Sequence, residues 1–376
     1  MSDSSTPQTR RTSLRSGLSR TTSYTDENNV LTHSERIESK HRWDELRAET
    51  VYSTWEWGTV CENFGHDRYY LGIERDGELR AGIPLMFNDS RLFGKKLVSM
   101  PYAPYGSILI RRDAANPHEY RQHLIEDLQS LTDSLSADQA SIRGYNATTI
   151  DDPNFTTTNE FVTFEADLRN GEDQVWEDVA SRFRRGVRKA RKNDVRVEKG
   201  FDDSSFAAYY EMYLDNMHYY GTPPYSRRFF RNVHTVLGER DAFELYLAYD
   251  DEGRPINGVT AFFHGDRAIY WTGVSDHEYR ELNGGSLLLW EAMSDACDRG
   301  YPIFDLGRTR EGTGVYRYKD GIGNPVELID RHYAPDGVDR PPNPDDGYDT
   351  YKTIWRKLPV KLTEYLGPHL RRRLTI

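Results

Sequence analysis

One supersecondary pattern occurs twice in this chain, and the duplication constrains the fold more than any other feature. In the first copy, residues 69–73 have the pattern of a strand, Asp76-Gly77 that of a hairpin turn, and residues 79–87 that of the returning strand. In the second copy, residues 243–249, 251–253 and 256–264 have the same succession. In both, a further glycine (Gly82 or Gly258) lies five residues after the turn glycine. The sequence therefore predicts a duplicated α/β unit.

The segments after each hairpin support the duplication and place the boundary. Another strand pattern comes next, at 97–100 and 268–273, and then a helical pattern, at 118–135 and 286–299. At roughly 150 residues per domain, the length of 376 residues predicts two to three domains. A strand pattern at 161–166 opens the second unit. We predict an α/β (α+β) protein with mixed sheets flanked by helices. Its parts are a disordered tail (1–29), a first domain (30–160), a second domain (161–335), and a loop with a basic helical segment (336–376).

Composition and charge restrict the partners. The chain carries 60 Asp and Glu against 49 Lys and Arg, a net charge of −11, so any site for anions must be local. Its two cysteines lack the C-x-x-C spacing of zinc or redox sites, and we predict no metal site. No apolar run approaches the roughly 20 residues that span a bilayer, so we expect no transmembrane span and a cytoplasmic location. The Arg- and Ser-rich tail leaves a transit peptide as the alternative to disorder.

A basic island at residues 182–192 stands out in this acidic chain. At 100° per residue, an apolar stripe is expected on one face of a helix and cations on the opposite face. The stripe is Val179, Phe183, Val187 and Ala190, and the cations are Arg185, Arg188, Lys189 and Lys192. A nucleotide diphosphate, an RNA backbone or acidic lipid headgroups are candidate ligands, and a solvated face balanced by acids is the alternative. Gly186 in mid-helix suggests that a ligand or another backbone approaches there.

A glycine turn precedes the apolar helix of the second unit. It comprises Arg280, Asn283, Gly284, Gly285 and Ser286. A helix that opens on such a turn presents backbone N–H groups and the positive end of its dipole, which suits a pyrophosphate. A plain helix start capped by Ser286 or Gly285 is the alternative.

The third constellation comes after a short buried strand at Phe304-Asp305-Leu306. Arg308, Tyr316, Tyr318 and Lys319 then lie in a segment bracketed by glycines, where side chains tend to be directed at a site. A lysine behind a strand can stabilise the oxyanion of acyl transfer. An ordinary surface lysine is the alternative.

Together these stretches resemble the Fem-type aminoacyltransferases, a GNAT-superfamily group of two tandem acetyltransferase-like domains. The resemblance covers most of residues 35–333 and is most specific at 181–197, 217–223 and 304–323. It implies tandem GNAT-like domains, with Tyr318-Lys319 matching a catalytic Phe-Lys pair and the donor-loop role falling on residues 280–286. Two departures are Tyr318 for Phe and Asn283 for the first glycine of the donor loop.

The resemblance implies transfer of an acyl or aminoacyl group to an amine, from either aminoacyl-tRNA or acyl-CoA, with no tightly bound cofactor. Characterised bacterial members act on a peptidoglycan precursor, so we expect a small or lipid-linked amine acceptor that bears phosphate or belongs to the cell envelope. Lys319 would hold the oxyanion, the basic helix the acceptor's phosphates, and Asp305 or His218 would be candidates for the proton acceptor. The alternative function is an inactive GNAT-like module that binds nucleotide or RNA.

The C-terminal stretch 355–373 is basic and aromatic, and it resembles the tail of Fem-like proteins linked to surface polysaccharide systems. Peripheral contact with an anionic membrane is one interpretation, and docking onto the protein's own domains is the other.

Overall fold

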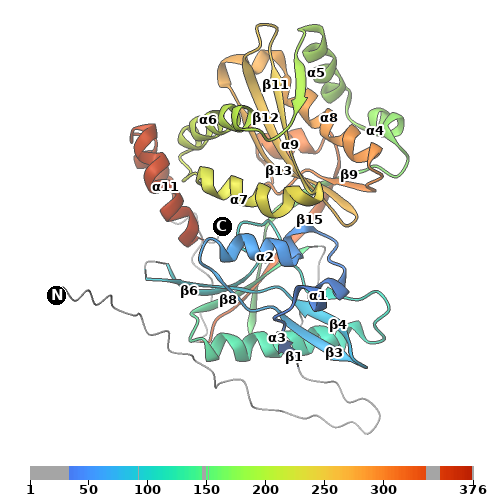
Figure 1. The fold of residues 1–376 in the computed structure, drawn as a ribbon, viewed down its shortest axis with the longest axis vertical. Coiled ribbons are helices and arrows are strands. Elements are labelled where there is room, and N and C mark those ends of the chain that lie inside the picture. The colour runs from blue at the N-terminus through green and yellow to red at the C-terminus, as the bar shows by residue number, and fades with distance from the viewer. Residues whose placement is uncertain (1–33, 92, 146–149, 151, 336–347, 375–376) are drawn as a thin grey trace, which may run out of the picture.

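The computed structural model describes residues 34–91, 93–145, 150, 152–335 and 348–374 (Figure 1). The tail at 1–29 and the loop expected at 336–347 lie outside the described residues, so neither prediction is tested.

Fifteen strands form two sheets in the described part of the chain. A small sheet has the order β1-β3-β4-β7, and an 11-stranded sheet has the order β10-β11-β12-β13-β14-β9-β15-β8-β6-β5-β2. The strands are β1 (Ser34–Arg36), β2 (Asp67–Arg68), β3 (Leu71–Arg75), β4 (Glu78–Ile83), β5 (Met86–Ser90), β6 (Gly94–Ser99), β7 (Leu109–Ile110), β8 (Gln139–Tyr145), β9 (Phe155–Asp167), β10 (Arg196–Lys199), β11 (Phe243–Tyr249), β12 (Pro255–His264), β13 (Arg267–Ser275), β14 (Ile303–Asp305) and β15 (Asn324–Tyr333).

Helices cover these sheets. The α-helices are α1 (Lys40–Trp43), α2 (Trp55–Glu62), α3 (Pro117–Ser134), α4 (Glu172–Asp178), α5 (Ser181–Lys192), α6 (Asp203–Tyr220), α7 (Arg227–Leu237), α8 (Gly284–Asp298), α9 (Gly314–Lys319), α10 (Tyr348–Trp355) and α11 (Val360–Leu374). Short 3₁₀ turns are η1 (Asp44–Leu46), η2 (Val51–Ser53), η3 (Gly238–Arg240) and η4 (His277–Leu282).

The duplicated hairpin is confirmed, with one correction. β3 pairs antiparallel with β4, as β11 does with β12, and the turn glycines Gly77 and Gly253 both have a positive φ, of 77° and 80°. The expected single strand 79–87 is wrong, because β4 ends at Ile83 in the small sheet and β5 begins at Met86 in the long sheet. Pro84 lies at the break, where its missing N–H cannot continue a ladder.

The long sheet joins the two units. β9 pairs with β14 of the second unit, while β15 pairs with both β9 and β8. The predicted boundary near residue 160 falls inside β9. A displacement of either unit therefore has to strain a shared sheet.

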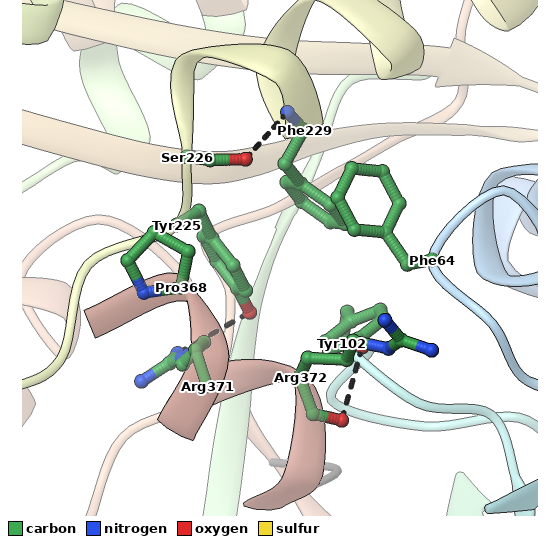
Figure 2. Close-up of a pocket in the computed structure, with 8 residues that line it drawn as sticks. All are labelled: Phe64, Tyr102, Tyr225, Ser226, Phe229, Pro368, Arg371 and Arg372. Carbon is green, nitrogen blue, oxygen red and sulfur yellow. Dashed lines mark hydrogen bonds between the residues drawn. The ribbon is translucent and has the colours of Figure 1, made fainter. Parts of the chain in front are cut away.

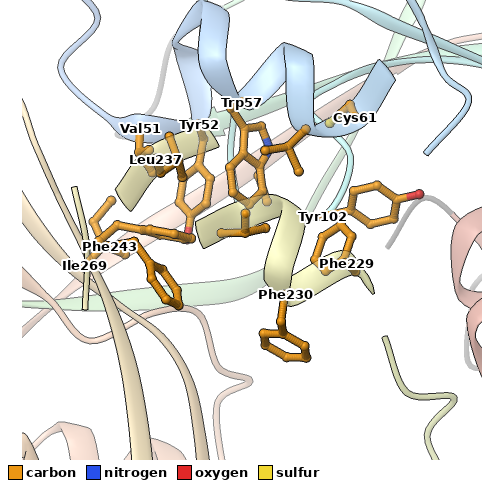
Figure 3. Close-up of a cluster of buried hydrophobic side chains, with 14 of the residues drawn as sticks. Val51, Tyr52, Trp57, Cys61, Tyr102, Phe229, Phe230, Leu237, Phe243 and Ile269 are labelled. Atoms are coloured by element: carbon orange, nitrogen blue, oxygen red, sulfur yellow. The ribbon is translucent and has the colours of Figure 1, made fainter. Parts of the chain in front are cut away.

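Aromatic side chains fill the contact between the units, where α2 faces α7 (Figures 1 and 3). Trp57 of α2 is fully buried, and its ring lies 5.5 Å from that of Phe262 in β12. Phe229 of α7 lies 5.2 Å from Tyr102 of the first unit. Burying each such ring stabilises the fold by about 1.5–3 kcal/mol, so this interface is a core rather than a loose hinge.

The C-terminal helices dock onto the protein itself, as one of the two interpretations predicts. The His218 ring lies 2.8 Å from the carbonyl oxygen of Leu358, and a Cβ built on Gly367 would lie 2.3 Å from Pro224. His218 thus binds this segment. Within the described ranges, no helix is both long enough and apolar enough to cross a bilayer.

Candidate active site

The basic island forms α5, and its two faces are as predicted except that Val179 lies before the helix, in an extended conformation. The apolar stripe is buried, and Arg185, Arg188, Lys189 and Lys192 are exposed. A Cβ built on Gly186 would lie 2.9 Å from Oγ of Ser286, at the start of α8. The segment that approaches Gly186 closely is therefore the predicted donor loop.

Most of the positive charge on α5 is not neutralised. Among described residues, only Arg184 and Arg191 of its seven cations lie within 4 Å of a carboxylate: Glu177 at 2.9 Å and Glu291 at 3.1 Å. Arg182 and Lys189, four residues before and three after Gly186, share its side of the helix. This distribution argues against a face balanced by neighbouring acids.

The predicted donor loop has a left-handed residue before its glycines. Asn283 is the N-cap of α8 with φ of 60°, a conformation that asparagine tolerates better than most residues, and no side chain caps the helix. The alternative of a cap by Ser286 or Gly285 is therefore wrong. No acidic residue lies in the first turn of α8, and the guanidinium of Arg280 contacts the His277 ring nearby. The positive end of this helix therefore meets no acid in its own first turn, which suits an anion.

Tyr318 connects the three constellations. Its hydroxyl lies 3.3 Å from Oγ of Ser286, and its ring lies 6.2 Å from that of Phe183 in α5. The guanidinium of Arg182 donates to the carbonyl oxygen of Arg317. Tyr316 instead packs its half-buried ring against Phe164, at 5.0 Å, on the outside of the second unit's core.

Lys319 points into the protein. Its Nζ donates to the carbonyl oxygens of Gly307 at 2.7 Å and Arg308 at 3.3 Å, and it lies 5.7 Å from the centre of the Tyr270 ring. The residue is only 7% exposed, so the alternative of a surface lysine is wrong. Burial lowers the pKa of Lys319 to about 8, against the opposing effect of the Asp305 charge. The side chain remains mostly an ammonium at pH 7.

Asp305 is fully buried and holds the two units together. Its carboxylate accepts hydrogen bonds from the hydroxyls of Tyr105 and Thr163 and, at 2.8 Å, from the N–H of Gly307. Tyr105 belongs to the first unit and Thr163 to β9. Asp305 therefore fixes the turn at Gly307 whose carbonyl oxygen binds Lys319.

Next to this turn, the pairing between β13 and β14 ends while β13 continues. β13 pairs in parallel with β14 over Arg267–Ile269 only and then continues to Ser275, with a register shift against β12 at Trp271. Among described strands, none pairs with that edge of β13 beyond Ile269. An extended ligand can lie along such an edge and bond to its backbone.

Arg308 faces away from α5. Its guanidinium lies over the Phe161 ring at 4.6 Å, and burial, together with the charges of Arg143 and Arg371, lowers its pKa to about 10. Arg371 donates to the Tyr225 hydroxyl at 3.2 Å in a small pocket between the units and α11 (Figure 2). The pocket is lined by Phe64, Tyr102, Tyr225, Ser226, Phe229, Pro368, Arg371 and Arg372. The Arg308 side chain thus belongs to this interdomain side. Lys319, which follows Tyr318 in the chain, donates to the carbonyl oxygen of Arg308.

Sequence reasoning missed four residues of this arrangement. Arg182 begins the basic island and could have been found from its spacing to Gly186. Tyr105, Thr163 and Tyr270 come from distant parts of the chain, and no local pattern connects them with Asp305 or Lys319.

Known proteins resemble the second unit in sequence and most of the chain in fold. Residues 178–320 match the family model described as "Acetyltransferase (GNAT) domain". The second unit therefore matches the GNAT acetyltransferase family over this range. No curated protein matches the sequence.

Solved structures extend the likeness to both units. The crystal structure of FemX has a TM-score of 0.66 at 14% identity, over 81% of this chain and 97% of that one. A tandem GNAT protein from the clavulanic acid biosynthesis pathway has a TM-score of 0.51 at 11% identity, over 80% and 98%. The C-terminal domain of a putative lysylphosphatidylglycerol synthetase from Agrobacterium fabrum has a TM-score of 0.52 at 9% identity, over 84% and 93%. The fold is that of a tandem GNAT protein, as the resemblance predicts.

Proposed function

We propose that this protein is an N-acyltransferase that moves an acyl or aminoacyl group onto an amine of an anionic acceptor. The GNAT domain supports an acyltransferase in general. The observation that carries the proposal is the position of Lys319, a buried ammonium. The residue before it, Tyr318, contacts Ser286 at the α8 N-terminus. The Lys319 ammonium itself donates to the carbonyl oxygens of Gly307 and of Arg308, whose side chain lies on the interdomain side.

The reaction forms a C–N bond and breaks the C–S or C–O bond of the donor. The amine nitrogen loses a proton, and the leaving thiol or hydroxyl gains one. Two N–H groups of Lys319 bind carbonyl oxygens, which leaves the third to stabilise the tetrahedral oxyanion. Asp305, with no exposed surface, is assigned to positioning the Gly307 turn rather than to contact with the amine.

The donor is assigned to the side of α5 and α8. Acyl-CoA and aminoacyl-tRNA both bear phosphates, which the α8 N-terminus and the unneutralised cations of α5 can bind. Because α5 adjoins the donor loop, we assign its cations to the donor's phosphates rather than to the acceptor's. Asn283 places a Cβ where a glycine would let a pyrophosphate approach, so we expect weak binding of acetyl-CoA and favour aminoacyl-tRNA.

The acceptor is assigned to the interdomain side. Arg308 and Arg143 are half-buried there with Arg371 close by, and the charge of Asp330 offsets only part of theirs, so an anionic ligand suits this side. A phosphate-bearing or cell-envelope amine, small or lipid-linked, has that chemistry.

Transfer assays test the proposal. Molecules retained after gentle purification are identified by mass spectrometry, and radiolabelled acetyl-CoA or aminoacyl-tRNA is then offered with these molecules and with a panel of primary amines. We expect a labelled amide from one donor and its loss in Lys319→Met. If phosphate ligands bind but neither donor yields an amide, the protein is a binding module and the proposal is wrong.

A further inference from the structure

Exposed apolar side chains gather at the C-terminal end of this protein. Nine large hydrophobic side chains are exposed among the described residues, and two of them, Val315 and Tyr318, belong to α9 at the candidate site. The other seven lie on α10, on α11 and at the end of α6, and we call them the C-terminal apolar face: Tyr219, Tyr220, Tyr351, Ile354, Leu362, Tyr365 and Leu366.

α11 exposes an apolar face to solvent, whereas an ordinary surface helix buries its apolar face. Thr363 is 2% exposed, and Gly367 packs against Pro224. Leu362, Tyr365 and Leu366 instead face outward and are 40%, 71% and 37% exposed. Their spacing of three and four residues makes one stripe, which an amphipathic helix normally buries. Exposure of this stripe requires a partner or another function.

The parts of the face are joined by direct contacts. The guanidinium of Arg356 donates to the carbonyl oxygen of Tyr220 at 3.4 Å. A Cβ built on Gly221 would lie 2.9 Å from Lys352 of α10. The end of α6 therefore adjoins α10, while α11 lies along the edge of the molecule in Figure 1.

This region has the opposite charge from the rest of the chain. Residues 348–374 contain seven Lys and Arg but only two Asp and Glu, whereas the whole chain has a net charge of −11. One of the two acids, Glu364, lies 3.6 Å from Nε of Arg227. The exposed cations are Arg356, Lys357, Lys361, Arg372 and Arg373.

We propose that the C-terminal apolar face binds the surface of an anionic lipid bilayer. Leucine, isoleucine and tyrosine beside Lys and Arg are the composition of interfacial helices, where apolar groups enter the headgroup region and cations meet lipid phosphates. A second copy of this chain would bring two strongly basic faces together, and lysine is depleted at the centre of protein interfaces. The lipid surface is therefore the occupant that suits both the charge and the apolar stripe.

The inner side of the same helix lines the interdomain pocket through Pro368, Arg371 and Arg372 (Figure 2). Lipid binding by the outer face would hold this pocket beside the bilayer. The binding itself does not depend on the proposed transferase activity.

Vesicle sedimentation with the full chain tests the inference. We expect the protein to sediment with phosphatidylcholine vesicles that contain about 30% phosphatidylglycerol and much less with pure phosphatidylcholine. The double variant Tyr365→Ser, Leu366→Ser should weaken binding at least about tenfold. Lys357→Gln with Lys361→Gln should weaken it by roughly fivefold per side chain, and added salt should weaken it further.

A matched control is Arg196→Gln with Lys199→Gln, which removes the same charge from β10 and should bind vesicles like the wild type. Circular dichroism melts confirm that each variant is folded. Equal sedimentation of all variants, or no preference for anionic vesicles, would overturn the inference. So would a dimer in light scattering that Tyr365→Ser, Leu366→Ser dissociates, since a second copy would then cover the face.

Discussion

The helices α3 and α8 come after the same hairpin pattern in the two units, yet their first turns differ in chemistry. α3 starts with Pro117 after Asn116 and has Glu119 in its first turn. α8 starts with two glycines after Asn283 and has no acid there. Proline lacks an N–H group and glutamate repels anions, so only α8 can offer its N-terminus to a phosphate. Duplication of a fold thus does not imply duplication of a site.

The sheets of the two units differ in the same sense. The first unit is broken at Pro84 into strands of two sheets. In the second unit, no described strand pairs with the edge of β13 beyond Ile269, beside Lys319. The first unit contributes Tyr105, which binds Asp305. It thus helps to position Asp305 of the second unit, and it supplies one wall of the interdomain pocket.

Replacing Lys319 by methionine should lower the rate of transfer, and this is the largest effect that we expect. Loss of one oxyanion donor lowers kcat by about 10²–10³, while affinity for substrates should change little. Single-turnover transfer measures this, and thermal melting checks the fold. Arginine should rescue poorly, because its planar fork places the charge differently. A folded variant with activity within about threefold of wild type would remove Lys319 from the chemistry.

The pH dependence of that effect distinguishes two roles for Lys319. Its folded pKa of about 8 means that the ammonium is present below pH 8 and is lost above it. The ratio of wild-type to Lys319→Met rates, which cancels titration of the acceptor, should therefore fall about tenfold between pH 7 and pH 9. A ratio that rises over this interval would show that neutral Lys319 acts as a base instead.

Much of the second unit could be predicted from the sequence because its signals are local. The α5 stripe, the glycine turn before α8 and the strand at Phe304 can each be inferred from periodicity or turn residues within a dozen positions. The burial of Lys319 and the three donors to Asp305 could not be predicted, because Tyr105 and Thr163 reach Asp305 through tertiary packing. Pro84 indicates the split of strand 79–87, because proline has no N–H group for a strand ladder. The apolar residues on both sides of Pro84 nevertheless favour one continuous strand.

The glycines shared by the two hairpins should have equal structural importance. A Cβ at Gly82 would lie 2.7 Å from Leu46, and one at Gly258 would lie 2.6 Å from Tyr209. Gly82→Ala and Gly258→Ala should each lower the free energy of unfolding by about 1–3 kcal/mol through overpacking. Gly77→Asn is the control, because asparagine tolerates a positive φ and nothing lies within 4 Å of that position. Thermal unfolding measures all three, and an unchanged Gly258→Ala would contradict the close packing of β12.

Cations on different sides of α5 should contribute unequally to donor binding, and this difference is the smallest effect that we expect. Lys189 shares the side of Gly186, whereas the Arg188 guanidinium lies 5.4 Å from the centre of the Trp176 ring. Lys189→Glu should weaken donor binding severalfold, and Arg188→Glu should do so less. Titration of acetyl-CoA and of aminoacyl-tRNA at two salt concentrations measures both. Equal losses would mean that the whole basic face acts as one diffuse field.

Hydrogen exchange of the two helix starts tests the central contrast most directly. Amide exchange is measured in the wild type, alone and with saturating acetyl-CoA or aminoacyl-tRNA. We predict donor-dependent protection at residues 284–287 of α8 and no change at residues 118–120 of α3. Protection at α3, or none at α8 under conditions where a donor is bound, would contradict the assignment of the donor site to the second unit.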